Sequence, residues 1–285
     1  MRLTALAPAK INRELRVGGL RPDGYHEVRS RIVSISLADR LSAEAASELS
    51  LSCDAPELIA SGENLVTRAA RLLAARAGIA AGASIALEKR VPVGGGLGGG
   101  SADAAVALRL LARLWRLRQA DSAFAELAAE LGSDVPFFLA GGEADVEGRG
   151  EVVTPVPDGA SADLLLLVPP FSISTSAVYR RFAGRGVLPE RLDVASPSER
   201  FLGPNDLAPA VLEEEPRMWD YVESAARTTA DHAISGSGAA IVLHGAGAEA
   251  ESLLRGRHPE ARIIRCRTLS REEHARWTDP TGGVS

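Results

Sequence analysis

Six glycines and one leucine form residues 94–100, Gly94-Gly-Gly-Leu-Gly-Gly-Gly100, and this segment most constrains the fold and the ligand of the chain. Glycine lets the backbone turn its N–H groups towards a ligand and lets that ligand approach closely. Residues 101–117 follow with the clearest amphipathic helix pattern of the sequence. Because a helix start adds unsatisfied N–H donors and partial positive charge, we predict a polyphosphate-binding loop. The alternative is a flexible connection between a strand and a helix.

Other known phosphate-binding patterns fit this segment poorly. A P-loop places Gly-Lys-Ser/Thr at the helix start, whereas Ser101 and Ala102 follow Gly100 here. A Rossmann loop also requires a strand that ends in an acidic residue about 20 residues further on, and the pattern in that region is helical. A protein kinase carries a whole set of catalytic motifs, none of which the sequence shows.

Length and composition limit the kind of molecule further. A chain of 285 residues fits two moderate domains, and the composition break at Val156-Pro-Asp-Gly159 predicts domains at residues 1–157 and 158–285. The net charge of −5 argues against a nucleic-acid-binding protein. No apolar run approaches the length of a membrane span, and residues 1–10 lack a signal-peptide core, so the expected compartment is the cytoplasm.

Hydrophobic periodicity predicts mixed α and β structure. The expected strands are residues 3–15 with breaks, 28–37, 84–88, 164–168, 239–244 and 261–268. The expected helices are residues 101–117, 122–131, 176–182, 207–227 with interruptions, and 248–255, with further helices starting near Asn64 and Ser133. The strand–helix–strand ending predicts an α+β sandwich, and the tail from Thr278 is expected to be disordered.

Three motifs resemble those of the GHMP kinases, small-molecule kinases whose glycine loop carries no lysine. Residues 92–105 resemble the central motif, Ala7-Pro-Ala-Lys-Ile-Asn12 the first, and Ile234-Ser-Gly-Ser-Gly-Ala239 the third. Five further segments resemble one branch of this superfamily: Asp23-Gly-Tyr-His-Glu27, Glu63-Asn-Leu65, Leu131-Gly-Ser-Asp-Val-Pro136, Glu147-Gly-Arg-Gly150 and Asn205-Asp-Leu207. The match runs from about residue 5 to 245. It implies a two-domain α+β fold, with an N-terminal left-handed βαβ domain, a C-terminal ferredoxin-like domain and the active site in the cleft between them.

Resemblance to this branch of the superfamily implies phosphorylation of the 2-hydroxyl of 4-diphosphocytidyl-2-C-methyl-D-erythritol in the non-mevalonate isoprenoid pathway. It also implies ATP and Mg²⁺ as cofactors. Two alternatives stay open: another GHMP kinase, acting on a sugar, homoserine or a mevalonate-type alcohol, and a non-catalytic nucleotide-binding protein on the same scaffold. The sequence does not indicate the oligomeric state.

The resemblance assigns the chemistry to two residues. Asp134 matches the catalytic aspartate, which accepts the proton of the attacking alcohol, although by itself Asp134 would be interpreted as a helix cap. Lys10 matches the partner that orients it, although a lone lysine in an apolar stretch is usually a snorkelling edge residue. Asn12 is expected to position the substrate.

The nucleotide-binding residues also follow from the resemblance. Asn64 and Leu65 match the adenine side, and the phosphate side comprises Gly94, Gly95, Gly96, Leu97, Gly98, Gly99, Gly100 and Ser101. Ser101 offers a hydroxyl to phosphate or magnesium. Because Ala102 stands where the family usually has a second serine, no metal ligand is assigned.

Aromatic residues point to a nucleobase in the substrate. Tyr25 and Tyr179 resemble a pair that sandwiches a cytosine ring, and stacking is worth about 1–3 kcal/mol per base. His26 is expected to contact the edge of the base, and Thr175 lies in the matching substrate segment. A packing role for an aromatic residue on a turn is the plainer alternative.

The residues directly after the first motif differ from the usual family pattern. Arg13 and Glu14 follow Asn12, where an apolar residue is usual. Strand alternation would place Arg13 on the same face as Ile11 and Leu15. We therefore expect either an edge strand or an ion pair between Arg13 and an acidic residue, and we predict that Arg13→Leu is tolerated.

Overall fold

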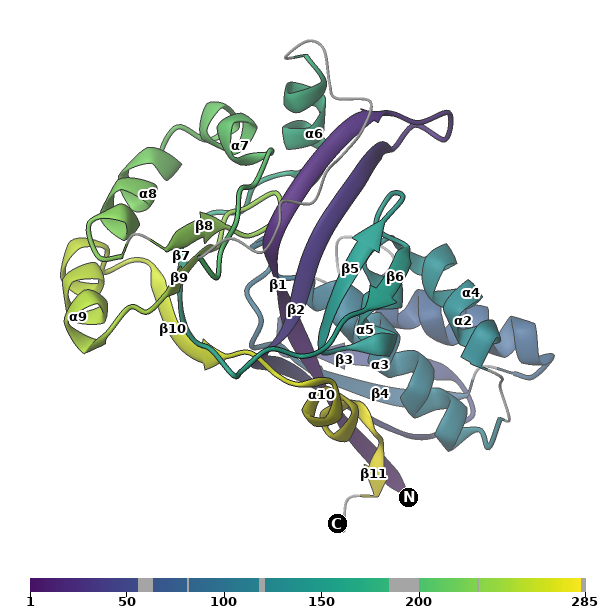
Figure 1. Ribbon diagram of the computed structural model, residues 1–285. Helices are drawn as coiled ribbons and strands as arrows, with labels where there is room; N and C mark the ends of the chain where they lie inside the picture. The colour runs from purple at the N-terminus through teal and green to yellow at the C-terminus, as the bar shows by residue number, and fades with distance from the viewer. Residues whose placement is uncertain (56–63, 81, 118–120, 185–199, 230, 283–285) are drawn as a thin grey trace.

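The computed structural model describes residues 1–55, 64–80, 82–117, 121–184, 200–229 and 231–282. Glu63, the first residue of the family-like segment Glu63-Asn-Leu65, therefore lies outside the described residues. Two β-sheets make up the core, and helices pack against each (Figure 1). No helix of the described ranges is long and apolar enough to cross a membrane.

The described residues form a seven-stranded sheet from residues 2–155 and from β11 near the C-terminal end of the chain, in the order β11-β1-β2-β4-β3, with β5 on β2 and β6 on β5. Its strands are β1 (Arg2–Leu20), β2 (His26–Ala45), β3 (Leu49–Cys53), β4 (Ala83–Glu88), β5 (Glu143–Glu147), β6 (Val152–Pro155) and β11 (Thr281–Gly282). The accompanying helices are α2 (Leu65–Ala77), α3 (Gly99–Leu114), α4 (Asp121–Leu131) and α5 (Val135–Ala140). β3 and β4 are parallel and α2 connects them, which gives the expected βαβ unit.

The C-terminal sheet has the strand order β10-β7-β9-β8. Its strands are β7 (Asp163–Val168), β8 (His232–Ile234), β9 (Ile241–His244) and β10 (Arg262–Arg267), and its helices are α6 (Thr175–Ala183), α7 (Ala208–Glu214), α8 (Met218–Ala226) and α9 (Ala248–Arg257). In chain order this is the 4-1-3-2 arrangement, with helices after the first and third strands. The ferredoxin-like prediction is therefore confirmed.

A shared apolar cluster holds the two sheets together. Ile11 and Ile35, from β1 and β2, are fully buried against Leu166 and Val242 of the second sheet. Burying a large apolar side chain contributes about 1.5–3 kcal/mol. The β1–β2 ribbon thus belongs to the first sheet and also packs against the second. The end of the ribbon at the turn between β1 and β2 projects beyond both sheets (Figure 1).

The C-terminal segment returns to the first sheet. Helix α10 (Arg271–Thr278) packs near β1, and β11 pairs with β1 at Leu3 and Thr4. In Figure 1, β11 accordingly lies beside the N-terminal end of β1. The expected disorder from Thr278 is therefore wrong as far as residue 282, while residues 283–285 lie outside the description.

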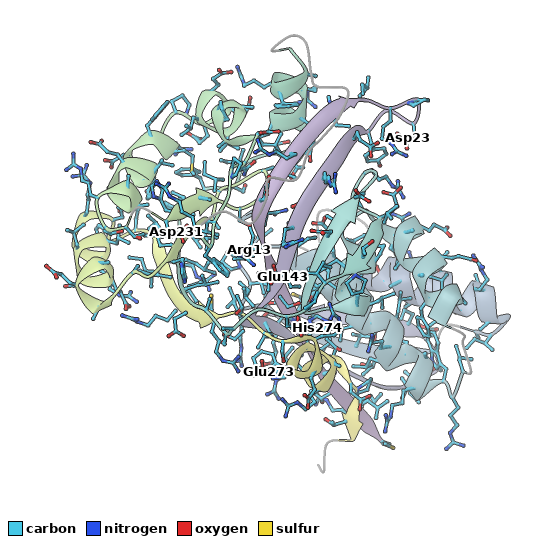
Figure 2. All side chains as sticks on the ribbon, in the orientation of Figure 1. Arg13, Asp23, Glu143, Asp231, Glu273 and His274 are labelled. Atoms are coloured by element: carbon cyan, nitrogen blue, oxygen red, sulfur yellow. The ribbon has the colours of Figure 1, made fainter. Side chains whose placement is uncertain are left out.

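The expectation that Arg13 shares a face with Ile11 and Leu15 is also wrong. The register of β1 against β2 shifts between Asn12 and Glu14, so a bulge interrupts the alternation. Ile11 and Leu15 accordingly join different apolar clusters. Arg13 forms the expected ion pair, with Glu143 of β5 at 2.5 Å (Figure 2).

Candidate active site

A cavity of about 1050 Å³ opens between the two parts of the molecule, and every site residue expected from the sequence lines it. The side assigned to ATP comprises Asn64, Leu65, Gly94, Gly95, Gly96, Leu97, Gly98, Gly99, Gly100 and Ser101. The side assigned to catalysis and substrate comprises Lys10, Asn12, Tyr25, His26, Asp134, Thr175 and Tyr179. The chain thus brings together residues that stand as far apart in sequence as 10 and 179.

The glycine loop leads directly into α3, as predicted. Gly98 precedes the helix with φ +70°, and Gly94 and Gly96 also adopt positive φ. A Cβ on Gly96 would lie 2.1 Å from the carbonyl oxygen of Ser235, so only glycine fits there. The second glycine loop thus lies directly against the first.

Hydrogen bonds fix this contact. The amides of Ala239 and Ala240 donate to the carbonyls of Gly94 and Gly95, at 3.2 and 3.1 Å. The Ser235 hydroxyl donates to the Gly96 carbonyl at 3.2 Å. Because these carbonyls are engaged by the protein, the loop is held rigidly at the cavity wall.

Lys10 and Asp134 lie next to each other in the cavity wall. The Lys10 ammonium donates to Oδ1 of Asn12 at 2.7 Å and lies 3.6 Å from Oδ2 of Asp134. Asn12 in turn donates to the Ser30 hydroxyl at 2.8 Å. The side chain of Lys10 is 6% exposed and that of Asp134 is 40% exposed. A buried cation therefore supports a carboxylate that a ligand can reach.

Asp134 does not act as a helix cap. It precedes α5 at the N-cap position, but its side chain makes no capping hydrogen bond. A capping carboxylate would accept from the amides of the first turn. The structure thus removes the structural alternative for this residue and leaves its carboxylate in the cavity.

Helix α5 is fixed from two sides. The Phe138 ring packs so closely on the glycine loop that a Cβ on Gly98 would lie 2.7 Å from it. The carbonyl of Phe138 accepts from Nε2 of His274 at 3.0 Å, and Nδ1 of His274 faces the Ser34 hydroxyl at 2.9 Å. His274, on α10 and labelled in Figure 2, therefore connects the C-terminal segment to the helix that follows Asp134 through its bond to Phe138.

Asn64 has a structural role at the cavity rim. Its Oδ1 accepts from the Val66 amide at 2.8 Å and caps α2. The side-chain nitrogen of Asn64 is thus the group left for a ligand. Leu65 opens the helix beside it and faces Gly100.

The predicted aromatic residues lie at the opposite end. The rings of His26 and Tyr179 stack at 5.7 Å between centroids, and Tyr25 is 49% exposed. Burial, together with the charge of Asp134, raises the pKa of Tyr179 above its usual range, so its phenol stays protonated. Tyr179 thus packs on His26.

Contacts of the His26 ring fix its tautomer. Nδ1 lies 2.9 Å from the Gly18 carbonyl, which can only accept, so Nδ1 carries the proton. In the neutral ring, Nε2 is then an acceptor.

Thr175 belongs to the wall formed by the second domain. Its hydroxyl lies 2.9 Å from that of Ser237 in the second glycine loop. Ser101 lies in the first turn of α3. Within the described residues, no group of three acidic, histidine or cysteine side chains could hold a metal ion by itself.

A buried charge cluster, which sequence reasoning missed, lies under the glycine loop. The Lys89 ammonium bonds to Asp103 at 2.8 Å and also to Asp39. Burial raises the pKa of Asp103 to about 7, although Lys89 opposes the shift. Burial lowers the pKa of Lys89, but the two carboxylates outweigh this effect and raise it. Nothing in the spacing of these residues indicates the cluster.

Arg149 was also missed as a cavity residue, although it belongs to the family segment Glu147-Gly-Arg-Gly150. Its guanidinium lies 5.1 Å from the centroid of the Tyr25 ring. The signal that could have identified it is an arginine between two glycines in a turn.

Comparison with known proteins agrees with the geometry. The family model "GHMP kinases N terminal domain" matches residues 64–142. The chain is 49% identical to the 4-diphosphocytidyl-2-C-methyl-D-erythritol kinase of Pelotomaculum thermopropionicum over 195 residues, which cover 68% of each chain. It is 42% identical to the enzyme of that name from Salinibacter ruber over 255 residues, 85% of this chain and 89% of the relative.

A solved structure extends the agreement to the fold. The crystal structure of a 4-(cytidine 5'-diphospho)-2C-methyl-D-erythritol kinase superposes with a TM-score of 0.76 at 32% identity, covering 93% of this chain and 98% of the other. The two-domain fold expected from the motifs is therefore confirmed. The chain belongs to the 4-diphosphocytidyl-2-C-methyl-D-erythritol kinase family of the GHMP kinases.

Proposed function

We propose that this ATP-dependent kinase transfers the γ-phosphoryl group of ATP to the 2-hydroxyl of 4-diphosphocytidyl-2-C-methyl-D-erythritol. The observation that carries the proposal is the position of Asp134. Its carboxylate, 3.6 Å from the Lys10 ammonium, shares one cavity with the glycine loop and with the Tyr25, His26 and Tyr179 aromatic group. The transferred phosphoryl group and the accepting alcohol would thus meet at this pair.

The chemistry requires little beyond positioning. Phosphoryl transfer passes through a loose transition state, so catalysis is mainly alignment and stabilisation of charge. Asp134 accepts the proton of the attacking hydroxyl. In such a loose transition state, this proton is transferred late. Lys10 orients that carboxylate and stabilises the charge that develops on the transferring group. Asn12 positions the alcohol.

ATP is expected along the glycine loop, with its phosphates at the start of α3 and its adenine near Asn64 and Leu65. Mg²⁺ usually binds one or two protein oxygens together with substrate phosphates and water, and Ser101 and Asp134 supply oxygens of this kind in the cavity. These residues fit a magnesium ion held mainly by the nucleotide, which would neutralise part of the phosphate charge.

His26 accounts for the choice of base. Its Nε2 acceptor suits the amino group that cytosine carries and uracil lacks. Tyr25 and Tyr179 would hold the ring by stacking, and Thr175 would contact the substrate beside them. The net charge of −5 supports a small-molecule substrate over nucleic acid, and the cytoplasm remains the proposed compartment.

A panel assay tests the proposal against both alternatives. Purified protein is incubated with ATP, Mg²⁺ and, separately, 4-diphosphocytidyl-2-C-methyl-D-erythritol, homoserine, mevalonate and a sugar, and ADP release is measured. We expect release with the cytidine substrate alone. Release with another alcohol would support a different GHMP activity, and nucleotide binding without release would support a non-catalytic role.

A further inference from the structure

We infer that Arg149 binds the diphosphate of the substrate and so selects a diphosphate-linked nucleotide over a bare nucleoside. This inference rests on the proposed function and deepens it. Arg149 lies on the turn between β5 and β6 and lines the cavity, but it belongs to neither the glycine loop nor the Lys10–Asp134 pair.

The place of Arg149 along the cavity matches the order of groups in such a substrate. On one side, its guanidinium lies 5.1 Å from the centroid of the Tyr25 ring, where the base would stack. On the other side, its neighbour Gly150 is so close to Asp134 that a Cβ there would lie 3.8 Å from Oδ1. The diphosphate connects the base to the reacting alcohol, so it would pass this arginine.

Hydrogen bonds hold Arg149 and its turn in place. Nη2 donates to the Ala129 carbonyl of α4 at 2.7 Å, and the backbone amide of Arg149 donates to Glu151 at 2.7 Å. The Gly148 carbonyl accepts from the Val28 amide of β2 at 2.7 Å. Rigidly held arginine is well suited to phosphate, because its planar guanidinium offers two parallel N–H donors.

Charge also favours Arg149 over the other cations of the cavity. Lys10 is paired with Asp134, and Lys89 with Asp39 and Asp103. Within the described part of the chain, no acidic side chain forms an ion pair with the Arg149 guanidinium, which donates to the Ala129 carbonyl and lies over the Tyr25 ring. The pKa of the nearby acidic residue Asp23 is lowered first by a hydrogen bond from the Tyr25 amide and also by the Arg149 charge. Asp23 is nevertheless exposed and pairs with Arg21 instead. The charge of Arg149 therefore remains available to an anion.

Arg180, on α6, also lines the cavity, but it is exposed. Ordering a long exposed side chain costs conformational entropy, whereas Arg149 is already ordered. We therefore assign the diphosphate to Arg149 and use Arg180 as a comparison.

Calorimetry with cytidine and with CDP tests this assignment, in the presence of a saturating non-hydrolysable ATP analogue that occupies the nucleotide site. The quantity of interest is the ratio of the two dissociation constants, because effects on base stacking cancel in it. Wild-type protein should prefer CDP. Arg149→Met should reduce that preference about tenfold to a hundredfold, the value of a charge-assisted hydrogen bond, and Arg149→Lys should restore part of it.

Two controls bracket the result. Arg217 lies over the Phe171 ring at 4.2 Å, outside the cavity, so Arg217→Met removes a similar stacked guanidinium and should leave the ratio unchanged. Arg180→Met should change it less than Arg149→Met does. With the natural substrate, Arg149→Met should raise KM more than it lowers kcat, because the diphosphate is bound equally in ground and transition states.

The outcomes separate this inference from the proposed function. An unchanged ratio in a folded Arg149→Met protein, or a loss that follows Arg180→Met instead, would overturn the inference while leaving the cytidine site intact. Wild-type protein that binds neither cytidine nor CDP would overturn the proposed function as well.

Discussion

The carboxylate of Asp134 lies 3.6 Å from the ammonium of Lys10, although Asp134 holds the N-cap position of α5 and a cap would turn it towards the helix. The pair joins β1 of the long ribbon to the start of α5, and both residues line the cavity. Since the capping alternative does not apply, the carboxylate is free to meet a substrate hydroxyl.

Removing the charge of Asp134 is expected to abolish most of the activity. Asp134→Asn should lower kcat by about 10²–10⁴, the usual contribution of a general base, with little change in stability because no cap is lost. Steady-state kinetics and urea unfolding measure the two effects. Asp279→Asn, at an exposed carboxylate paired with Arg113, is the control. A folded Asp134→Asn protein with unchanged kcat would eliminate the assigned role.

A small side chain on the glycine loop is expected to weaken ATP binding. Gly100 lies in α3 and a Cβ there would be 3.8 Å from Leu65, so Gly100→Ala fits the protein. If phosphate approaches the backbone at this point, the methyl group should lower ATP affinity about tenfold or more by disturbing one charged hydrogen bond. Calorimetry with a non-hydrolysable analogue measures this.

Gly256→Ala is the matched control, because it adds a methyl group to helix α9 where nothing lies within 4 Å. Gly98→Val would be a poorer test, since its Cβ would collide with Phe138 and perturb the fold itself. Normal ATP affinity in Gly100→Ala would argue against phosphate binding at the start of α3.

Local patterns predicted the elements that carry the site, but not the long-range contacts that assemble it. The glycine loop and the helix after it follow from local composition and periodicity, whereas the ferredoxin-like sheet was predicted only from the resemblance to the GHMP kinases. The return of α10 and β11 to β1 follows from neither, because such pairing depends on residues almost 280 positions apart. The bulge at Arg13 could not be predicted from the sequence either, because the alternation rule assumes a regular strand register.

Arg13 illustrates how such contacts change a prediction. Its guanidinium pairs with Glu143, whose side chain is only 7% exposed, and donates to the Phe201 carbonyl at 3.0 Å. Arg13→Leu should therefore lower the free energy of unfolding by about 1–3 kcal/mol, because a buried carboxylate loses a partner. The kcat should stay near that of the wild type, because Arg13 does not line the cavity.

Urea unfolding and steady-state kinetics separate these effects, and Arg13→Leu combined with Glu143→Gln should recover part of the lost stability. A large fall in kcat without loss of stability would instead place Arg13 in the reaction.

His274 is expected to make stability depend on pH. Burial lowers its pKa from 6.5 to about 4 in the folded protein. The unfolded chain therefore binds a proton first as pH falls, so the contribution is complete above about pH 6.5 and is lost as pH falls towards 4. Between about pH 7 and pH 5, the loss should be on the order of 1–2 kcal/mol.

Urea unfolding at the two pH values tests this dependence. Gln can donate to the Phe138 carbonyl without titrating, so His274→Gln should have a shallower pH dependence than the wild type. If the free energy of unfolding fell by the same amount between the two pH values in both proteins, groups other than His274 would control the stability at acidic pH.

The most direct test of the central claim compares the cytidine substrate with its uridine analogue. Uracil presents a carbonyl where cytosine presents an amino group, so it would face the Nε2 lone pair of His26, whose Nδ1 is engaged by Gly18. One or two mismatched hydrogen bonds in a desolvated pocket should lower kcat/KM for the uridine analogue roughly 10²-fold or more relative to the cytidine substrate. His26→Ala should reduce this difference in kcat/KM between the two substrates. Equal use of both analogues by the wild-type enzyme would contradict the cytosine site and leave a GHMP kinase of another substrate.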